Sequence, residues 1–241
     1  MMKLTLLLRQ LKIFMNNLAI IPARGGSKRI PRKNIKSFHG KPIITYSIEL
    51  AIESGLFDEI IVSTDDQEIA NISIKYGASV PFFRSPESSN DIASTFDVID
   101  EVLKEYELKS QEFKFICCIY PCAPFISIDN LQKSFKLLIE NNFDTVFPVV
   151  KYSMPVQRAI KIVNNKLEML FPEFQEKRSQ DLEPIYYDAG QFYWANVRKL
   201  LSNRNLYSNN SGCIILDELC AHDIDNENDW KVAEIKYSLF K

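Results

Sequence analysis

Residues 21–35 read IPARGGSKRIPRKNI, and this stretch indicates the fold because an apolar run ends in it and a glycine-containing loop begins. The loop has two glycines, five positive charges and no acid. Its cationic side chains are those of Arg24, Lys28, Arg29, Arg32 and Lys33. Glycine lets a backbone approach a ligand closely because it has no Cβ, and lysine and arginine supply the donors that phosphate oxygens accept. The stretch favours a strand followed by a phosphate-binding loop, although its composition alone also fits a nucleic-acid patch or a solvated loop.

The familiar phosphate-loop patterns do not describe this stretch. It contains neither the GxxxxGK[ST] pattern of P-loops nor the GxGxxG pattern of dinucleotide-binding folds. Its position still favours phosphate binding, because ligands of open α/β sheets bind outside the carboxyl ends of the strands. We expect the backbone N–H groups near Gly25 and Gly26 to form an anion-binding nest beside Ser27 and Lys28.

Positive charge is concentrated at the start of the chain. Residues 1–48 contain ten lysines and arginines and no acid, whereas residues 49–241 contain nineteen against thirty-one acids. The net charge is −2. A local positive field on a mildly acidic protein suits a small anionic ligand better than a DNA duplex, which requires a broad basic face. We therefore expect no nucleic acid as a partner.

Residues 1–14, MMKLTLLLRQLKIF, precede the first predicted strand. Arg9 and Lys12 interrupt their apolar run, which is too short to span a membrane and is followed by no small-residue cleavage site. We predict that residues 1–14 are a dispensable extension, that residues 15–241 form one domain, and that the protein is cytoplasmic and has no membrane partner.

Strand and helix patterns alternate through the first 150 residues. Apolar runs predict strands at 18–23, 59–66, 113–120 and 144–150. Helical spacing of apolar residues predicts helices at 42–57, 67–77, 94–107 and 127–142. Such alternation predicts an α/β fold with a mostly parallel sheet and helices on both faces.

The pattern changes after Val150. RAIKIVNNKLEMLF (158–171) predicts a hairpin around Asn164–Asn165, and PIYYDAGQFYWAN (184–196) predicts one strand that returns to the sheet. A two-stranded hairpin is marginal in water, and exposed apolar residues usually mark an interface. We predict that residues 152–183 form a protruding dimerisation arm and that the protein is a homodimer. The alternative is a hairpin that folds back on its own sheet.

Asp223 and Asp225 alternate in HDIDNENDW (222–230). Side chains two apart in extended backbone lie on one side, and such a carboxylate pair can hold Mg²⁺ together with water and substrate phosphates. The alternative is an acidic loop that caps the last helix. Combined with a cationic phosphate loop, the pair indicates magnesium-assisted nucleotide chemistry.

The motifs also resemble those of a known family. In the same order as the acylneuraminate cytidylyltransferases, the CMP-sialic acid synthetase family, the chain has IPARGGSKRIPRKNI, then GKPIITYSIELAIESGLFDEIIVSTDDQEIA (40–70), RSPESSNDIAST (84–95), YPCAPF (120–125) and DIDNENDW (223–230). Within that family, YYDAGQFYW (186–194) is most similar to the pseudaminic acid cytidylyltransferases. Sialic acid enzymes more often have an Asn-Gly pair where this chain has Ala189–Gly190.

The resemblance implies a Rossmann-like nucleotide-diphospho-sugar transferase fold and a defined reaction. CTP and a nine-carbon 2-keto acid sugar would give a CMP-sugar and pyrophosphate, through attack of the anomeric hydroxyl on the α-phosphorus. Such transfers depend on charge neutralisation and alignment. The implied CTP-binding residues are Arg24, Gly25, Gly26, Ser27, Lys28, Asn34, Arg84, Ala93 and Thr95. Lys33 would stabilise charge at the α-phosphate as a catalytic residue. Asp223 and Asp225 would hold Mg²⁺, and Asp225 would also assist deprotonation of the attacking hydroxyl.

For the sugar, the resemblance points to four residues in two segments. Arg178 or Gln180 would bind the sugar carboxylate, although an exposed loop explains EKRSQDLE (176–183) equally well. Gln191 and Tyr193 alternate along a predicted strand and would line the pocket. The resemblance also implies dimers in which the arm crosses to the partner, so that Arg178 or Gln180 acts in trans.

Two departures from the family pattern bear on the substrate. Tyr120-Pro121-Cys122-Ala123-Pro124 stands where sialic acid enzymes have Gln-Pro-Thr-Ser-Pro, and Ile126 stands where an arginine often follows. We expect CMP-pseudaminic acid as the product, used in surface or flagellar glycosylation. Alternatives are the same chemistry on a sialic or legionaminic acid, a 3-deoxy-manno-octulosonate cytidylyltransferase, and a non-catalytic nucleotide-binding module. Lys33, Asp223 and Asp225 together argue against the last.

Overall fold

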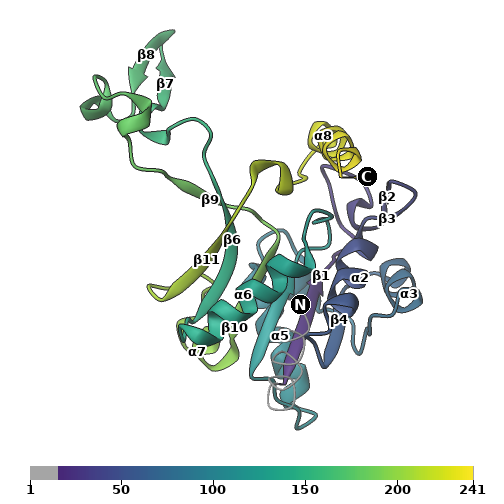
Figure 1. The fold of residues 1–241 in the computed structure, drawn as a ribbon. Helices are drawn as coiled ribbons and strands as arrows, with labels where there is room; N and C mark the ends of the chain where they lie inside the picture. The colour runs from purple at the N-terminus through teal and green to yellow at the C-terminus, as the bar shows by residue number, and fades with distance from the viewer. Residues whose placement is uncertain (1–15, 241) are drawn as a thin grey trace.

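A central sheet organises the computed structural model, which describes residues 16–240 (Figure 1). Its seven strands run in the order β11-β6-β10-β5-β1-β4, with β9 also paired to β6. Their bounds are β1 Asn17–Pro22, β4 Glu59–Ser63, β5 Phe115–Ile119, β6 Thr145–Lys151, β9 Tyr186–Asp188, β10 Phe192–Asn196 and β11 Ser211–Leu216. β1 is parallel to β4 and β5, and β11 is parallel to β6, whereas β9 and β10 are antiparallel to their neighbours. The predicted mostly parallel α/β sheet is confirmed.

Helices cover both faces of this sheet, as predicted (Figure 1). The helices of the described chain are α2 Ile44–Ser54, α3 Gln67–Lys75, α4 Pro86–Ser89, α5 Thr95–Glu107, α6 Ile128–Glu140, α7 Val197–Asn203 and α8 Glu227–Ser238. Alternate side chains of β1 go to opposite faces: Ala19 and Ile21 pack with α2 and α6, and Leu18 and Ile20 pack with α5. All four side chains are fully buried, so the period-2 pattern of this strand fixes both core layers.

Short polar residues begin these helices at the ends of strands and loops. The Ser94 hydroxyl accepts from the Asp97 N–H in a capping box at α5, Asp66 caps α3 and Ser127 caps α6. Each cap satisfies a backbone donor that the first helical turn leaves unpaired. The caps therefore hold the loops at the carboxyl ends of the strands to the helices that follow.

The segment predicted as one strand, 184–196, forms two. β9 and β10 lie on the same side of β6, with Asp188 opposite Val149 and Trp194 opposite Val146. Asp188 and Trp194 are six positions apart in the chain, whereas their partners are three apart, so residues 189–191 bulge out of the ladder. Gly190 adopts a φ of 62° there, and its N–H donates to the Asp188 carboxylate at 2.9 Å. The glycine explains the break, since a left-handed residue does not continue a strand.

The predicted hairpin is present, and it lies apart from the central sheet in Figure 1. β7 (Ile160–Val163) and β8 (Lys166–Met169) are antiparallel, and Asn164 and Asn165 have positive φ, as a two-residue type I′ turn requires. Exposed apolar side chains of this arm include those of Ile160, Ile162, Leu167, Leu170 and Phe171. In this chain the hairpin does not fold back on its own sheet.

Smaller elements complete the described chain. They are β2 Ser37–Phe38 and β3 Lys41–Pro42, and the 3₁₀ turns η1 Lys33–Ile35, η2 Val156–Arg158, η3 Pro172–Phe174, η4 Ser179–Asp181 and η5 Glu218–Cys220. Over residues 16–240, no helix combines the length and the apolar character needed to cross a lipid bilayer. The predicted extension, residues 1–14, lies outside the described residues.

Candidate active site

A cavity of about 620 Å³ lies beyond the carboxyl end of β1 and brings together segments that are far apart in the sequence. The basic loop after β1 forms one wall, residues 84–98 another, and residues 120–122 and 223–225 complete it. Ten of the residues predicted for the site line it: Arg24, Ser27, Lys28, Lys33, Asn34, Arg84, Ala93, Thr95, Asp223 and Asp225. The structure thus gathers most of the predicted nucleotide and metal residues at the sheet edge where α/β folds bind ligands.

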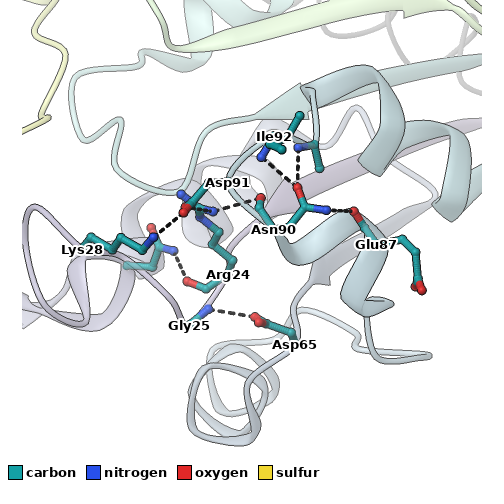
Figure 2. A network of polar contacts seen from close by, with 10 residues as sticks. Arg24, Gly25, Lys28, Asp65, Glu87, Asn90, Asp91 and Ile92 are labelled. Atoms are coloured by element: carbon teal, nitrogen blue, oxygen red, sulfur yellow. Dashed lines mark hydrogen bonds and ion pairs between the residues drawn. The ribbon is translucent and has the colours of Figure 1, made fainter.

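One carboxylate links two cations of the loop. Arg24 donates to Asp91 at 2.7 Å and to the Asn90 carbonyl at 3.0 Å, and Lys28 lies 2.5 Å from the other Asp91 oxygen (Figure 2). The Asn90 side chain in turn accepts from the N–H groups of Ile92 and Ala93. Hydrogen bonds from Lys28 and Arg24 lower the pKa of Asp91, so the carboxylate is charged. Nothing in the sequence marked Asp91 for this role, because it lies more than sixty residues from its partners.

The two glycines of the loop differ in their surroundings. The Gly25 N–H donates to Asp65 at 2.8 Å and so already has a protein acceptor (Figure 2). A Cβ on Gly25 would lie 2.8 Å from an Asp66 carboxylate oxygen, which explains why glycine stands there. A Cβ on Gly26 would meet no described heavy atom within 4 Å. Gly25 therefore packs the loop against the end of β4, and neither glycine is among the residues lining the cavity.

Lys33 and Asn34 connect the loop to other walls of the cavity. Lys33 donates to the Ile224 carbonyl at 2.7 Å, with its Nζ 3.8 Å from Asp225 Oδ1. The Asn34 side-chain amide donates to the Arg24 carbonyl at 2.9 Å. The Cys122 thiol donates to the Asn34 side-chain oxygen at 3.3 Å. Burial raises the pKa of the Cys122 thiol to about 12, so this sulfur is a neutral donor that orients the amide.

The two aspartates predicted as metal ligands lie together in the cavity, on either side of the buried Ile224. Burial raises the pKa of Asp223, and the charge of Asp225 raises it further. Arg29 pairs with Asp225 at 2.8 Å. Among the described residues, no group of three or more histidines, cysteines and acids gathers around a common point. A pair of carboxylates suits a hard divalent cation such as Mg²⁺, whose remaining ligands would have to come from substrate phosphates and water.

Three of the predicted CTP-binding residues, Arg84, Ala93 and Thr95, line another wall of the cavity. Arg84 is 7% exposed and donates to the Ser63 hydroxyl at 3.0 Å, so its guanidinium is fixed at the end of β4. Burial lowers its pKa. The Thr95 and Tyr120 hydroxyls are 3.0 Å apart. Tyr120 thus places a phenol in the wall where an amide stands in the sialic acid motif.

The four predicted sugar residues do not line this cavity. Arg178 lies in the arm, where it pairs with Asp181 at 2.8 Å, and Gln180 lies in η4 of the same arm. Gln191 is buried and donates to the Cys220 carbonyl at 2.7 Å. Tyr193 is buried, and its hydroxyl donates to Asp188 at 2.7 Å. The bulge brings Gly190, rather than its neighbour Gln191, to the cavity wall.

Comparison with known proteins agrees with this arrangement. The family model described as Cytidylyltransferase matches residues 18–202. The pseudaminic acid cytidylyltransferase of Campylobacter jejuni is 40% identical over 226 residues, which cover 93% of this chain and 97% of that protein. The CMP-N,N'-diacetyllegionaminic acid synthase of Legionella pneumophila is 31% identical over 230 residues, which cover 91% of this chain and 95% of that protein.

The fold has a solved counterpart as well. The structure of a CMP:2-keto-3-deoxy-manno-octonic acid synthetase complexed with CTP matches with a TM-score of 0.68 at 16% identity, covering 94% of this chain and 100% of the other. At that identity the likeness concerns the fold, and it confirms the predicted nucleotidyltransferase architecture. Since the family model matches well over half of the sequence and the relatives match nearly all of it, the chain belongs to the cytidylyltransferase family.

Proposed function

We propose that the chain transfers CMP from CTP to pseudaminic acid, giving CMP-pseudaminic acid and pyrophosphate. The observation that carries this proposal is the cavity itself, in which the basic loop, the Arg84–Thr95 wall and the Asp223–Asp225 pair face one space. The similarity to the pseudaminic acid cytidylyltransferase of C. jejuni supports the choice of sugar. Ala189–Gly190, at the bulge that reaches the cavity, supports it too.

The reaction requires an in-line exchange at the α-phosphorus. The anomeric hydroxyl oxygen forms a bond to phosphorus, the bond to the pyrophosphate oxygen breaks, and the hydroxyl proton leaves. Arg24, Lys28 and Lys33 would bind the triphosphate, with Lys33 neutralising charge that develops near the α-phosphate. Asp225, whose side chain lines the cavity, would accept or direct the departing proton.

Asp223 and Asp225 would hold the Mg²⁺ that the reaction calls for. A bound divalent cation supplies charge neutralisation at the transferring and leaving phosphoryl oxygens. Burial, and then the charge of Asp225, raise the pKa of Asp223, and a bound cation would favour the charged form of this carboxylate.

We also propose that the active form is a cytoplasmic homodimer joined through the arm of residues 152–183. The exposed apolar side chains of the hairpin support this, since a single chain leaves them in water. In such a dimer, Arg178 or Gln180 would approach the partner's cavity and contribute to binding of the sugar carboxylate.

A second candidate is the same transfer to a legionaminic or sialic acid. It is favoured by the 31% identity to the legionaminic acid synthase of L. pneumophila. A third, a nucleotide-binding module without activity, keeps the cavity but requires no turnover.

A coupled pyrophosphate assay separates these candidates. Purified protein with Mg²⁺ and CTP is given pseudaminic, legionaminic or N-acetylneuraminic acid, and the CMP-sugar is identified by mass spectrometry. We expect the highest kcat/KM with pseudaminic acid. Without a sugar, we expect no release of pyrophosphate. Preference for another sugar would replace the first candidate by the second, and CTP binding without turnover of any sugar would support the third.

A further inference from the structure

Arg32 belongs to the basic loop but does not line the cavity. The other cations of the loop do line it: Arg24, Lys28, Arg29 and Lys33. The Arg32 guanidinium points instead to α3, where it donates to both carboxylate oxygens of Asp66, at 2.6 and 2.8 Å, and to Glu68 at 2.5 Å. Such a two-pronged contact fixes the plane of the guanidinium as well as its distance. The guanidinium is therefore directed toward α3 and not into the cavity.

The backbone of Arg32 begins the turn that carries Lys33 and Asn34. Arg32 has φ 55° and ψ 32°, a left-handed conformation that costs energy in a residue other than glycine. Its carbonyl accepts from the N–H groups of Ile35 and Lys36, both at 3.0 Å. Lys33 and Asn34 lie within this turn, so the direction in which they leave the backbone depends on the conformation of Arg32.

Consecutive aspartates at the end of β4 hold the loop at two points. Asp65 accepts from the Gly25 N–H at 2.8 Å, and Asp66 fills the space beside the Cα of Gly25 while it also binds Arg32. Asp66 is itself fixed, because its carboxylate accepts from the Ile69 N–H at 2.9 Å as the cap of α3. The loop is therefore attached, at its start and near its end, to one rigid part of the sheet.

We infer that Arg32 is a positioning residue for the transfer reaction: paired with Asp66, it holds Lys33 at the α-phosphate site without touching the substrate. This inference rests on the proposed role of Lys33 in the same cavity. A catalytic charge that is displaced by about 1 Å can lose on the order of a hundredfold in rate. The Arg32–Asp66 pair therefore affects kcat through geometry, and CTP affinity much less.

Two substitutions test the pair without disturbing its surroundings. Arg32→Gly removes the guanidinium but adopts the left-handed conformation freely, and Asp66→Asn removes the charge but keeps a good helix cap. We expect each to lower kcat by about tenfold or more, with KM for CTP changed by less than about threefold. The double variant should lose no more than the worse single variant, since both break one interaction.

Combining Arg32→Gly with Lys33→Ala tests whether Arg32 acts through Lys33. Arg32→Gly should lower kcat by less than about twofold in the Lys33→Ala background, because the group that it positions is gone. Wild-type kcat in Lys33→Ala alone would overturn the proposed role of Lys33. If adding Arg32→Gly to Lys33→Ala lowers kcat by a further tenfold, Arg32 does not act through Lys33. That result would leave the proposed role of Lys33 itself intact.

Lys133→Ala is the matched control, since it removes an exposed ion pair with Asp129 on α6, away from the loop. It should leave kcat, KM and the melting temperature unchanged. An Arg32→Gly variant with unchanged kcat, or with its whole loss in KM for CTP, would overturn the inference. If Arg32→Gly does not fold, Asp66→Asn decides by the same criterion.

Discussion

At the scale of single residues, Asp225 is the point where opposite charges meet in the cavity. Arg29 lies 2.8 Å and Lys33 3.8 Å from its Oδ1, and Asp223 lies on the other side of Ile224. Its negative charge is balanced by two cations, whereas that of Asp223 is disfavoured by burial and by Asp225 itself. Two carboxylates two residues apart thus have different environments, and different environments are how neighbouring acids acquire different roles.

Asp225→Asn should lower kcat by about a hundredfold or more, because it removes a carboxylate from a proposed metal pair and several kcal/mol of charge stabilisation with it. Its melting temperature should change little, since its partner Arg29 is 67% exposed and exposed pairs contribute little to stability. The measurement is the rate of pyrophosphate release against Mg²⁺ concentration. Glu218→Gln, outside the cavity, is the control, and near-wild-type activity of Asp225→Asn at every Mg²⁺ concentration would remove Asp225 from the site.

Lys33→Ala should reduce kcat by about ten- to a hundredfold and weaken CTP binding less, if the ammonium acts mainly on charge that develops in the transition state. Steady-state kinetics and calorimetric titration with CTP give the two quantities separately. Should binding weaken while kcat stays constant, Lys33 would be a ground-state contact to the triphosphate.

At the scale of elements, the carboxyl end of β4 supports the loop after β1. Asp65 and Asp66 contact its backbone and its Arg32 side chain, and Ser63 holds Arg84 across the cavity. The strand is parallel to β1, so its end lies beside the loop by construction of the sheet. The conformation of the loop is therefore fixed by contacts with the end of the neighbouring strand.

Asp66→Asn should make the protein less stable in a pH-dependent way. The Arg32 guanidinium, aided by the Ile69 N–H, lowers the pKa of Asp66 from 3.8 to about 2. A carboxylate whose pKa is lower in the folded state stabilises that state above the unfolded pKa, and its contribution is lost as the pH falls through the folded pKa. We expect the free energy of unfolding of Asp66→Asn to be about 1 kcal/mol below that of the wild type near neutral pH. This difference should shrink between about pH 4 and about pH 2, as followed by urea unfolding.

The matched control for this measurement is Glu140→Gln, whose exposed pair with Lys136 has an N–O distance of 3.6 Å. It should show no deficit at neutral pH. If the loss of unfolding free energy in Asp66→Asn is the same at about pH 2 and pH 7, the charge of the Asp66 carboxylate contributes nothing to stability.

The sequence predicted the elements and motifs of the chain better than it predicted which distant residues contact one another. The residue patterns predicted the parallel sheet and the hairpin, and the order of motifs predicted ten of the residues that line the cavity. The contact of Asp91 with Arg24 and Lys28 depends on how two distant loops meet, which no local pattern encodes. The break at residues 189–191 depends on register against β6, and an apolar run with one glycine is compatible with a continuous strand as well.

At the scale of the whole molecule, the described chain has a closely packed sheet domain and an arm that extends from it (Figure 1). The predicted CTP-binding residues belong to the sheet domain, and the predicted sugar residues Arg178 and Gln180 belong to the arm. In one chain these two groups are apart. In the proposed dimer, a second copy would supply its arm and complete the site, so we expect activity to depend on the oligomeric state.

Ile162→Asp should convert a dimer into a monomer at micromolar concentration, because Ile162 is 73% exposed on the hairpin and a charge there is costly to bury in an interface. Light scattering gives the mass, and circular dichroism should show an unchanged fold. Ile74→Asp on α3, where the side chain is 58% exposed, is the matched control and should remain dimeric. A wild-type protein that is fully active as a strict monomer would contradict both the dimer and the trans contact.

The Asp91 carboxylate has a consequence for selectivity. It is attached to the chain, so it faces Arg24 and Lys28 at a fixed and high effective concentration that no dilution removes. Any anion that binds those two cations competes with it. In the proposed reaction, inorganic phosphate would engage only a few donors and gain little from that exchange, whereas CTP would gain further contacts if it also reaches Lys33, Asn34 and Arg84. A tethered carboxylate of this kind would then favour the triphosphate over small anions.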